Sequence, residues 1–398
     1  MIVVIWHFRL SFGAPFMNVF LPFYRGGWVV VDLFFVLSGF ILTRIYCVDV
    51  VPDGYFRHFV IRRIARLYPL HLLTLIVVCI LLFVALQLTG RFILYRGYPY
   101  NDLWHFVLNL FLLQQVGLQT DYSFNGPSWS ISTEMVASVF LITIICFVRA
   151  DRRRTVCALA LLSAVGAKLF LFGYPYVERM FLQTCLGFLS GSLLAFGLAD
   201  VEKRRPPPHV KISIDSRASS PFRLPWRIPA GWPSDAIFVA CAALLVIWML
   251  FGSSLSQVNP VDRTSYVALD VIVMPMMLVA AMRSTLISYL SATAIGRWLG
   301  AVSYSVYLWH FPVAGIFSIG IYLLAIDRLT TMTQIFFLYA ATVLVVAHIS
   351  YHWFEWPARR WVIRRFDAAP PSRNDKKPAL DEDARRNSAN HQAREFIK

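Results

Sequence analysis

Long apolar runs constrain this chain more than any other feature of its sequence. They recur from end to end at close to the roughly 20 residues that an α-helix needs to cross a bilayer core. The residues are 58% hydrophobic and only 15% charged, with a mean hydropathy of +0.60. A soluble domain is about half apolar and about a quarter charged. We therefore predict an all-α fold, a polytopic helical bundle that is integral to a membrane.

About ten transmembrane helices are predicted. They lie at residues 1–12, 28–47, 68–88, 129–148, 155–172, 179–199, 236–252, 265–282, 302–325 and 334–353. The first is short for a full crossing, so we expect a first helix that is truncated at its start. A further apolar stretch, Leu103 to Val116, contains His105, Asn109, Gln114 and Gln115. It is expected to be interfacial or re-entrant rather than spanning.

The basic residues predict the orientation of the bundle. With the N-terminus inside, the predicted cytoplasmic segments hold 28 of the 37 Lys and Arg residues, and the outer segments hold five. Positive charge gathers on the cytoplasmic side of membrane proteins. We therefore expect a multi-pass protein of the bacterial cytoplasmic (inner) membrane with both termini cytoplasmic. The formal charge of +15 is explained by this topology, and no nucleic-acid partner is expected.

Two segments are predicted to lie outside the membrane. Residues 200–235 combine seven prolines with seven Lys and Arg residues, which is typical of a flexible cytoplasmic loop. Residues 367–398 are polar and charged and are predicted to be a disordered cytoplasmic tail. The membrane domain is accordingly assigned to residues 1–366. The sequence contains no metal-ligand motif, so no metal is expected.

Three ionisable residues in the predicted spans share roughly one depth, in the outer part of the bilayer. They are His7, Asp32 and Glu134. Such groups are rare in membrane spans unless they are paired or functional. A histidine can act as a general base near neutral pH, and a carboxylate can orient it. We therefore predict His7 as a base oriented by Asp32 or Glu134. The alternative is that His7 only makes a hydrogen bond between helices.

A basic segment follows the second predicted span. Arg62 and Arg66 are four residues apart, so on a helix they share a face with His58. Two guanidinium groups at the membrane surface suit bidentate contacts to phosphate. The alternative is that they serve only to retain this loop in the cytoplasm.

Six sequence blocks, taken together and in order, carry a family resemblance. They are Val3–Phe8, Val31–Phe40, Arg62–Pro69, Asn125–Glu134, Ser303–Pro312 and Phe354–Pro357. In content, order and spacing they resemble the acyltransferase 3 family, integral membrane O-acyltransferases that modify bacterial polysaccharides and related acceptors. The resemblance covers nearly all of residues 1–366.

The resemblance implies a role for each matching position. His7 corresponds to the family's essential histidine, and Arg62 and Arg66 match its donor-binding basic motif. Glu134 and His310 close two further blocks. The remaining pocket candidates are Ser38, Asn125, Trp129 and Tyr307. Family members carry an arginine about eleven residues before the histidine, and this chain begins six residues before it. We therefore expect either a start upstream of Met1 or an incomplete site.

The predicted function is a membrane O-acyltransferase. It would move an acyl group from acyl-CoA to a hydroxyl of a carbohydrate or lipid-linked glycan. The acyl group expected is acetyl. His7 would serve as the base or carry the acyl group briefly. Acyl-CoA is expected as a co-substrate, with no bound cofactor. Two alternatives stay open: a proton-coupled transporter or flippase that uses the same groups as a relay, and a non-catalytic partner in polysaccharide assembly.

Overall fold

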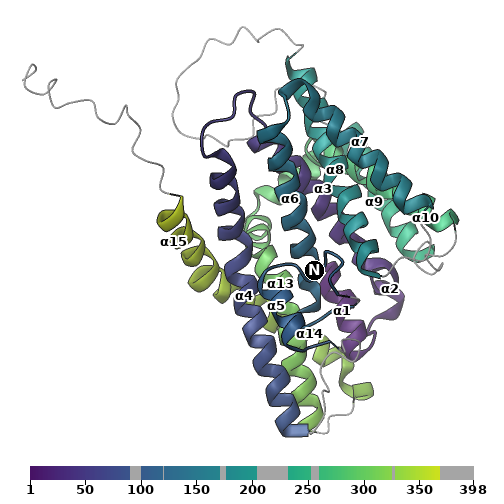
Figure 1. Cartoon of the computed structure of the whole chain (residues 1–398). Helices are drawn as coiled ribbons and strands as arrows, with labels where there is room; N and C mark the ends of the chain where they lie inside the picture. The colour runs from purple at the N-terminus through teal and green to yellow at the C-terminus, as the bar shows by residue number, and fades with distance from the viewer. Residues whose placement is uncertain are drawn as a thin grey trace, which may run out of the picture.

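The protein is a bundle of long helices, here seen in a computed structural model (Figure 1). The structure describes residues 1–89, 100–119, 121–170, 176–203, 232–251, 260–324 and 328–367. Of these residues 87% are helical, and none of them forms a strand. The predicted all-α membrane fold is therefore confirmed. Most of the loop predicted at 200–235, residues 204–231, lies outside the described residues, as does the predicted disordered tail beyond Asp367.

Fifteen α-helices make up most of the described residues. The first half of the chain forms α1 (Ile2–Phe12), α2 (Met17–Gly26), α3 (Val30–Tyr46), α4 (Tyr55–Thr89), α5 (Leu103–Leu110), α6 (Trp129–Phe147) and α7 (Ala150–Phe170). The second half forms α8 (Tyr176–Lys203), α9 (Trp232–Phe251), α10 (Pro260–Ala268), α11 (Met274–Ala281), α12 (Thr285–Ala292), α13 (Ala294–Leu323), α14 (Arg328–Ser350) and α15 (Trp356–Phe366). Short 3₁₀ turns precede α3 and α6, and π-helical turns join α10 to α11 and α14 to α15.

Eight helical segments in the described part of the chain are long and apolar enough to cross a membrane. They are Met17–Tyr46, Tyr55–Thr89, Gly126–Phe147, Met180–Val201, Trp232–Phe251, Thr264–Ala281, Ala294–Leu323 and Met332–Phe366. Each overlaps one of the predicted spans, which extends at most two residues beyond it. The other two predicted spans, 1–12 and 155–172, correspond to α1, which has 11 residues, and α7, which carries charges in its first and last turns. Neither is among the eight.

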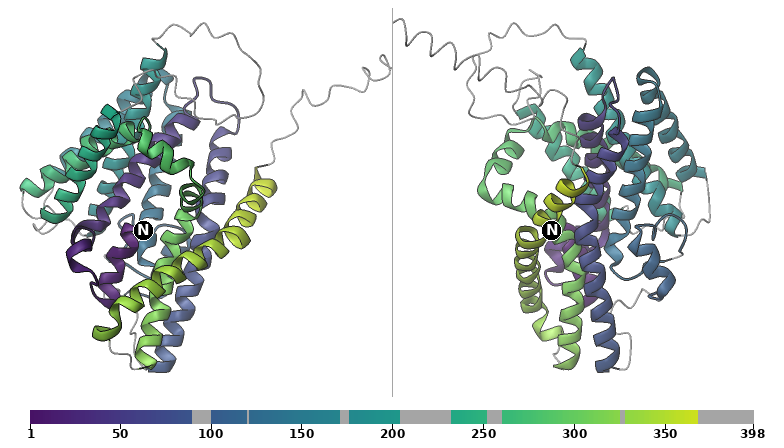
Figure 2. Two further views of the ribbon diagram at one scale, coloured as in Figure 1. Left: turned by 180° about the vertical axis from the view of Figure 1, so that it is seen from behind. Right: turned by 60° about the vertical axis from the view of Figure 1, so that its left-hand side comes forward.

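Two groups of helices flank α1. Helix α4 runs along one side of the bundle, with α13 beside it and α15 lying across its first half (Figures 1 and 2). Helices α7 to α10 lie on the opposite side. Helix α1 packs its buried apolar residues Val4, Phe8 and Phe12 against α13 and α14. The histidine of α1 is thereby held inside the bundle.

Helices α3 and α8 cross so closely that glycines are needed at the contact. A Cβ atom on Gly39 would lie 1.9 Å from the Phe188 carbonyl oxygen, and one on Gly191 would lie 2.0 Å from the Val36 oxygen. Small residues let membrane helices approach this closely. The crossing therefore fixes which face of α3 meets α8, and this decides the surroundings of Asp32.

The stretch predicted not to span the membrane contains α5, which has eight residues. After Leu110 the chain leaves the helix, and the described residues between it and the 3₁₀ turn at Gly126 have no regular structure. Non-helical backbone is tolerated at membrane depth where it is buried in protein or lines a cavity. This stretch lies against α4, α6 and α13 through contacts described below.

Candidate active site

The centre of the candidate site is a pair of histidines from opposite ends of the sequence. His7 Nδ1 of α1 lies 3.2 Å from His310 Nε2 of α13, and the ring centroids are 4.7 Å apart. His310 is fully buried, whereas His7 is partly exposed. His7 is therefore the more exposed member of the pair.

The hydrogen bonds of the pair define its tautomers. His310 Nδ1 lies 2.5 Å from the Tyr307 carbonyl oxygen, and His7 Nδ1 lies 3.0 Å from the Val3 carbonyl oxygen. A backbone carbonyl can only accept, so in the neutral rings both Nδ1 atoms carry the proton. His310 Nε2 is then an acceptor that receives the His7 Nδ1–H. This leaves the lone pair of His7 Nε2 available to take a proton.

The helix break at Pro312 connects His310 to the start of α6. Pro312 lies inside α13 and has no N–H, so the carbonyl of Leu308 loses its helical partner. Asn125 Nδ2 donates to that carbonyl at 3.2 Å. Asn125, one of the predicted pocket residues, is therefore anchored to the backbone two residues before His310.

Tyr307 forms a second link between α13 and α6. Its hydroxyl donates to the Pro127 carbonyl at 2.7 Å and lies 2.7 Å from Ser130 Oγ. Its own carbonyl accepts from His310. The predicted pocket residue Tyr307 thus joins the histidine pair to α6. Trp129, at the first turn of α6, packs edge-on against Phe35 in the apolar core.

Glu134 lies one helical turn beyond Ser130 and faces α4. Its Oε1 accepts from Arg63 Nη2 and from Ser38 Oγ, each at 2.7 Å. The two charged side chains are only 9% and 19% exposed. Glu134 therefore forms a largely buried ion pair with Arg63, and Ser38 is its second partner.

Asp32 lies in a different part of the bundle. Its carboxylate accepts from Gln183 Nε2 of α8 and from the Tyr266 hydroxyl of α10, both at 2.5 Å. The prediction that Asp32 or Glu134 orients His7 is corrected: His310 and the Val3 carbonyl hold that ring. Asp32 and Gly39 are seven residues apart on α3, so the face that crosses α8 carries both.

The two arginines predicted to bind the donor have different neighbours. Arg62 Nε donates to Asp367 Oδ2 at 2.8 Å, and His58 Nδ1 lies 2.7 Å from the other oxygen of that carboxylate. Arg66 is exposed and lies within electrostatic range of Glu355 and Arg359. The predicted shared face of His58, Arg62 and Arg66 is thus turned toward α15.

Sequence reasoning missed Arg63, although the sequence carries a signal for it. The buried residues of α4 in this region include Phe59, Arg63, Leu67, Leu70 and Thr74, which recur every three or four positions. Such spacing places them on one helix face. An arginine on the apolar stripe of a helix needs a buried partner, and Glu134 is that partner.

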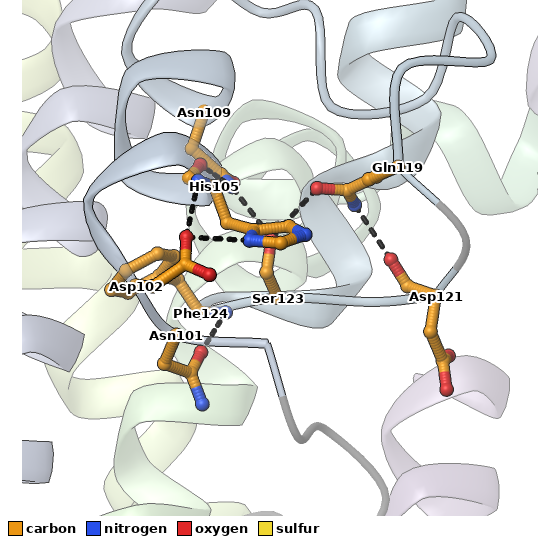
Figure 3. Close-up of polar contacts among 8 residues, drawn as sticks. All are labelled: Asn101, Asp102, His105, Asn109, Gln119, Asp121, Ser123 and Phe124. Atoms are coloured by element: carbon orange, nitrogen blue, oxygen red, sulfur yellow. Dashed lines mark hydrogen bonds and ion pairs between the residues drawn. The ribbon is translucent and has the colours of Figure 1, made fainter.

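The segment around α5 contains a network of polar side chains that face the bundle (Figure 3). Asp102 caps α5, accepting from the His105 backbone N–H at 2.9 Å and lying 2.7 Å from its imidazole Nδ1. These two hydrogen bonds hold the pKa of Asp102 below its ordinary value, and the one from the backbone N–H has the larger effect. Asn109 Nδ2 donates to the His105 carbonyl and to Ser123 Oγ, both at 2.8 Å. The network ties α5 to the irregular chain that follows it.

Comparison with known proteins decides the family. The family model described as an acyltransferase domain matches residues 1–351, most of the chain. The chain belongs to this family. The resemblance to the acyltransferase 3 family is thereby confirmed.

Curated relatives carry related names. The peptidoglycan O-acetyltransferase OatA of Listeria monocytogenes is 25% identical over 84% of this chain and 52% of its own length. The predicted peptidoglycan O-acetyltransferase YrhL of Bacillus subtilis is 25% identical over 86% of this chain and 52% of its own length. The chain spans about half the length of these relatives. No solved structure shows a significant match.

Proposed function

We propose that this family member transfers an acetyl group from acyl-CoA to a hydroxyl of a carbohydrate or lipid-linked glycan of the cell envelope. Family membership and the names of the relatives support acetyl transfer to a glycan. The observation that carries the proposal is the His7–His310 pair, in which His7 is partly exposed and the hydrogen bonds that hold its ring engage Nδ1 and not Nε2.

In the proposed reaction, His7 Nε2 takes the proton of the acceptor hydroxyl as its oxygen attacks the thioester carbonyl. The C–S bond then breaks, the acetyl group stays on the acceptor oxygen, and the imidazolium returns the proton to the CoA thiolate. A positioned general base contributes about 10²–10⁴-fold to such a step. His310 accepts the His7 Nδ1–H throughout, and this interaction strengthens when His7 becomes positively charged.

The donor is proposed to enter beside the first turns of α4. Arg66 is exposed there, with Arg359 of α15 in electrostatic range. Arg62 is already paired with Asp367, so a phosphate would have to compete with that carboxylate. Guanidinium groups bind phosphate strongly through paired N–H donors. We assign this end to the cytoplasm, where acyl-CoA is made, and both termini to the same side of the bacterial inner membrane.

The test of the proposal is acetyl transfer by the purified, detergent-solubilised protein. Transfer from acetyl-CoA to a β-1,4-linked N-acetylglucosamine tetramer is followed by CoA release and by mass spectrometry of the glycan. His7→Ala should elute as the wild type does on size exclusion but lose at least about 100-fold in kcat, the lower value for a general base.

His348→Ala is the matched control. This histidine is also on a membrane helix, but it is exposed and accepts from Trp298 Nε1 at 2.9 Å on the outer face of α14. It should retain wild-type activity. Transfer by His7→Ala at the wild-type rate would refute the assignment of the base, and absence of CoA release by the wild type would favour the transporter or partner alternatives.

A further inference from the structure

Several buried polar atoms near the histidine pair make no hydrogen bond to any residue that the structure describes. They are His71 Nδ1, Asn109 Oδ1, Gln114 Oε1, Gln115 Nε2, Gln115 Oε1, Asn125 Oδ1 and Trp309 Nε1. His71, Asn109, Gln115 and Asn125 are fully buried, and Gln114 is 2% exposed. A native protein leaves few buried polar atoms unpaired, and each such group requires an explanation.

These residues belong to one continuous polar region. His71 Nε2 lies 2.8 Å from the Asn109 carbonyl oxygen, and the His71 carbonyl accepts from Thr74 Oγ1 at 3.1 Å. Thr74 in turn accepts from Asn125 Nδ2 at 3.1 Å. Asn125 also donates to the Leu308 carbonyl, next to Trp309 and His310. The unpaired atoms therefore extend from α4 to the segment of α13 that holds His310.

Gln114 and Gln115 join the same region through α6. Gln114 Nε2 donates to the carbonyl and the hydroxyl of Ser128, both at 3.2 Å, and Ser128 N–H donates to the Asn125 carbonyl at 2.8 Å. The backbone N–H of Gln115 donates to Ser132 Oγ at 3.2 Å, which leaves its whole side-chain amide unpaired.

The hydrogen bonds that these residues already make determine which of the unpaired atoms are donors and which are acceptors. Asn109, Gln114 and Asn125 each donate their amide nitrogen to a backbone carbonyl, so the unpaired atom of each is an oxygen. His71 Nε2 also faces a carbonyl, so its Nδ1 is an acceptor in the neutral ring. With Gln115 Oε1 there are five acceptors, against two donors, Gln115 Nε2 and Trp309 Nε1.

This set disfavours an ionic ligand and favours a hydroxylated one. Five neutral acceptors disfavour an anion, and none of the seven unpaired atoms belongs to a charged group that would offset the desolvation of a buried cation. A hydroxyl group both donates and accepts, so several hydroxyls on one molecule match the mixture. An N-acetylated sugar adds an amide N–H for a further acceptor.

The exposure pattern of the segment supports the same conclusion. Most of its polar side chains are buried, while several of its large apolar residues are turned outward: Leu103 is 77% exposed, Trp104 55%, Phe111 66% and Leu118 48%. Leu108, Leu112 and Phe124 are buried. Membrane proteins place polar residues toward a bundle interior or a water-filled cavity. Chain without regular structure at this depth has the same requirement.

We infer that six residues with unpaired polar atoms form the acceptor site and bind an uncharged, hydroxyl-rich sugar beside His7: His71, Asn109, Gln114, Gln115, Asn125 and Trp309. The inference rests on the proposed function and concerns where the acceptor of that reaction binds. The sugar satisfies amide, imidazole and indole groups that are otherwise unpaired. Gln115 contributes most, because both of its amide atoms are available.

The test compares Gln115→Met with Gln119→Met in the full chain. Methionine has nearly the shape of glutamine and no amide. Gln119 lies in the same segment, is also buried, and has both amide atoms paired, with the Asp121 carbonyl at 2.7 Å and Ser123 Oγ at 3.2 Å. Binding of the N-acetylglucosamine tetramer is measured by isothermal titration calorimetry, without acetyl-CoA, so that it does not depend on catalysis.

Gln115→Met should weaken binding of the tetramer roughly ten- to hundredfold, the loss expected for two neutral hydrogen bonds. It should not lower the melting temperature of the sugar-free protein, because no protein hydrogen bond is removed. Gln119→Met should show the reverse: wild-type affinity and a lower melting temperature.

Each outcome bears on one conclusion. Equal affinity of Gln115→Met and wild type, or no binding by the wild type, would overturn the acceptor site and leave water as the occupant of these groups. If the tetramer is acetylated normally by Gln115→Met, the site is refuted and the proposed function stands. If binding follows the predicted pattern but no acetyl group is transferred, the proposed function fails and the sugar site stands.

Discussion

The ion pair of Arg63 and Glu134 is the contact whose removal has the most directly calculable effect. The Arg63 Nη2 to Glu134 Oε1 distance is 2.7 Å, and the side chains are 9% and 19% exposed. Removing one member of a buried pair typically costs about 3–5 kcal/mol, because the other charge stays buried alone. Glu134 keeps Ser38 as a partner, so for Arg63→Met we expect the lower value, about 3 kcal/mol.

A double-mutant cycle separates the pair from the rest of the structure. Glu134→Gln keeps an acceptor for Arg63 and Ser38 but removes the negative charge, and should cost roughly 1–3 kcal/mol. Arg63→Met with Glu134→Gln leaves neither charge buried. The double variant should therefore be more stable than the sum of the single effects by about 2 kcal/mol, roughly 30-fold in the unfolding equilibrium.

The assay is reversible unfolding of the detergent-solubilised protein by dodecyl sulfate, followed by tryptophan fluorescence. Arg62→Met is the control, since this neighbouring arginine is 47% exposed and its pair with Asp367 should contribute roughly 0–1 kcal/mol. Single effects that add within about 0.5 kcal/mol would show that the two charges are not coupled, and would refute the argument.

Three further predictions concern the donor, the histidine pair and the topology. Arg66→Lys should raise the KM for acetyl-CoA and leave the acceptor KM unchanged, because lysine keeps the charge but not the paired donors; steady-state kinetics checks this. His310→Phe should lower kcat about tenfold or more with little change in either KM, and His310→Gln should partly restore it, since the glutamine oxygen can accept the His7 N–H. Single cysteines at Gly117 and Arg152, in a cysteine-free background, should react with an impermeant thiol reagent from opposite sides of the membrane; reaction from the same side contradicts the predicted orientation.

The apolar runs predict the membrane helices well because length and hydropathy are local properties of the sequence. In the described part of the chain, all eight helical segments of sufficient length and hydropathy overlap a predicted span. Apolar length does not predict how far a helix continues beyond the span. Helix α13 begins at Ala294, eight residues before the predicted start, and α4 begins at Tyr55, thirteen before. These added turns are more polar, and caps such as Thr293, which accepts from the Gly296 N–H, determine where they begin.

The partners of the site residues could not be predicted in the same way. Depth in the bilayer follows from position along a helix, but the direction in which a side chain points depends on which helices are neighbours. Asp32 faces Gln183 because the α3–α8 crossing is set by Gly39 and Gly191, and glycine contacts are not visible in a hydropathy pattern. Predicted depth alone grouped Asp32 with His7, whose actual partner is His310.

The arrangement of the titratable groups also bears on the transporter alternative. A proton relay requires groups that exchange protons along a path of hydrogen bonds across the membrane. Here the carboxylates of Asp32 and Glu134 are each engaged by local partners, Gln183 with Tyr266 and Arg63 with Ser38. The histidine pair has one nitrogen, His7 Nε2, directed away from these contacts and carried on a partly exposed ring. One accessible basic atom held by a buried acceptor suits proton removal from a bound hydroxyl, and it favours group transfer over relay.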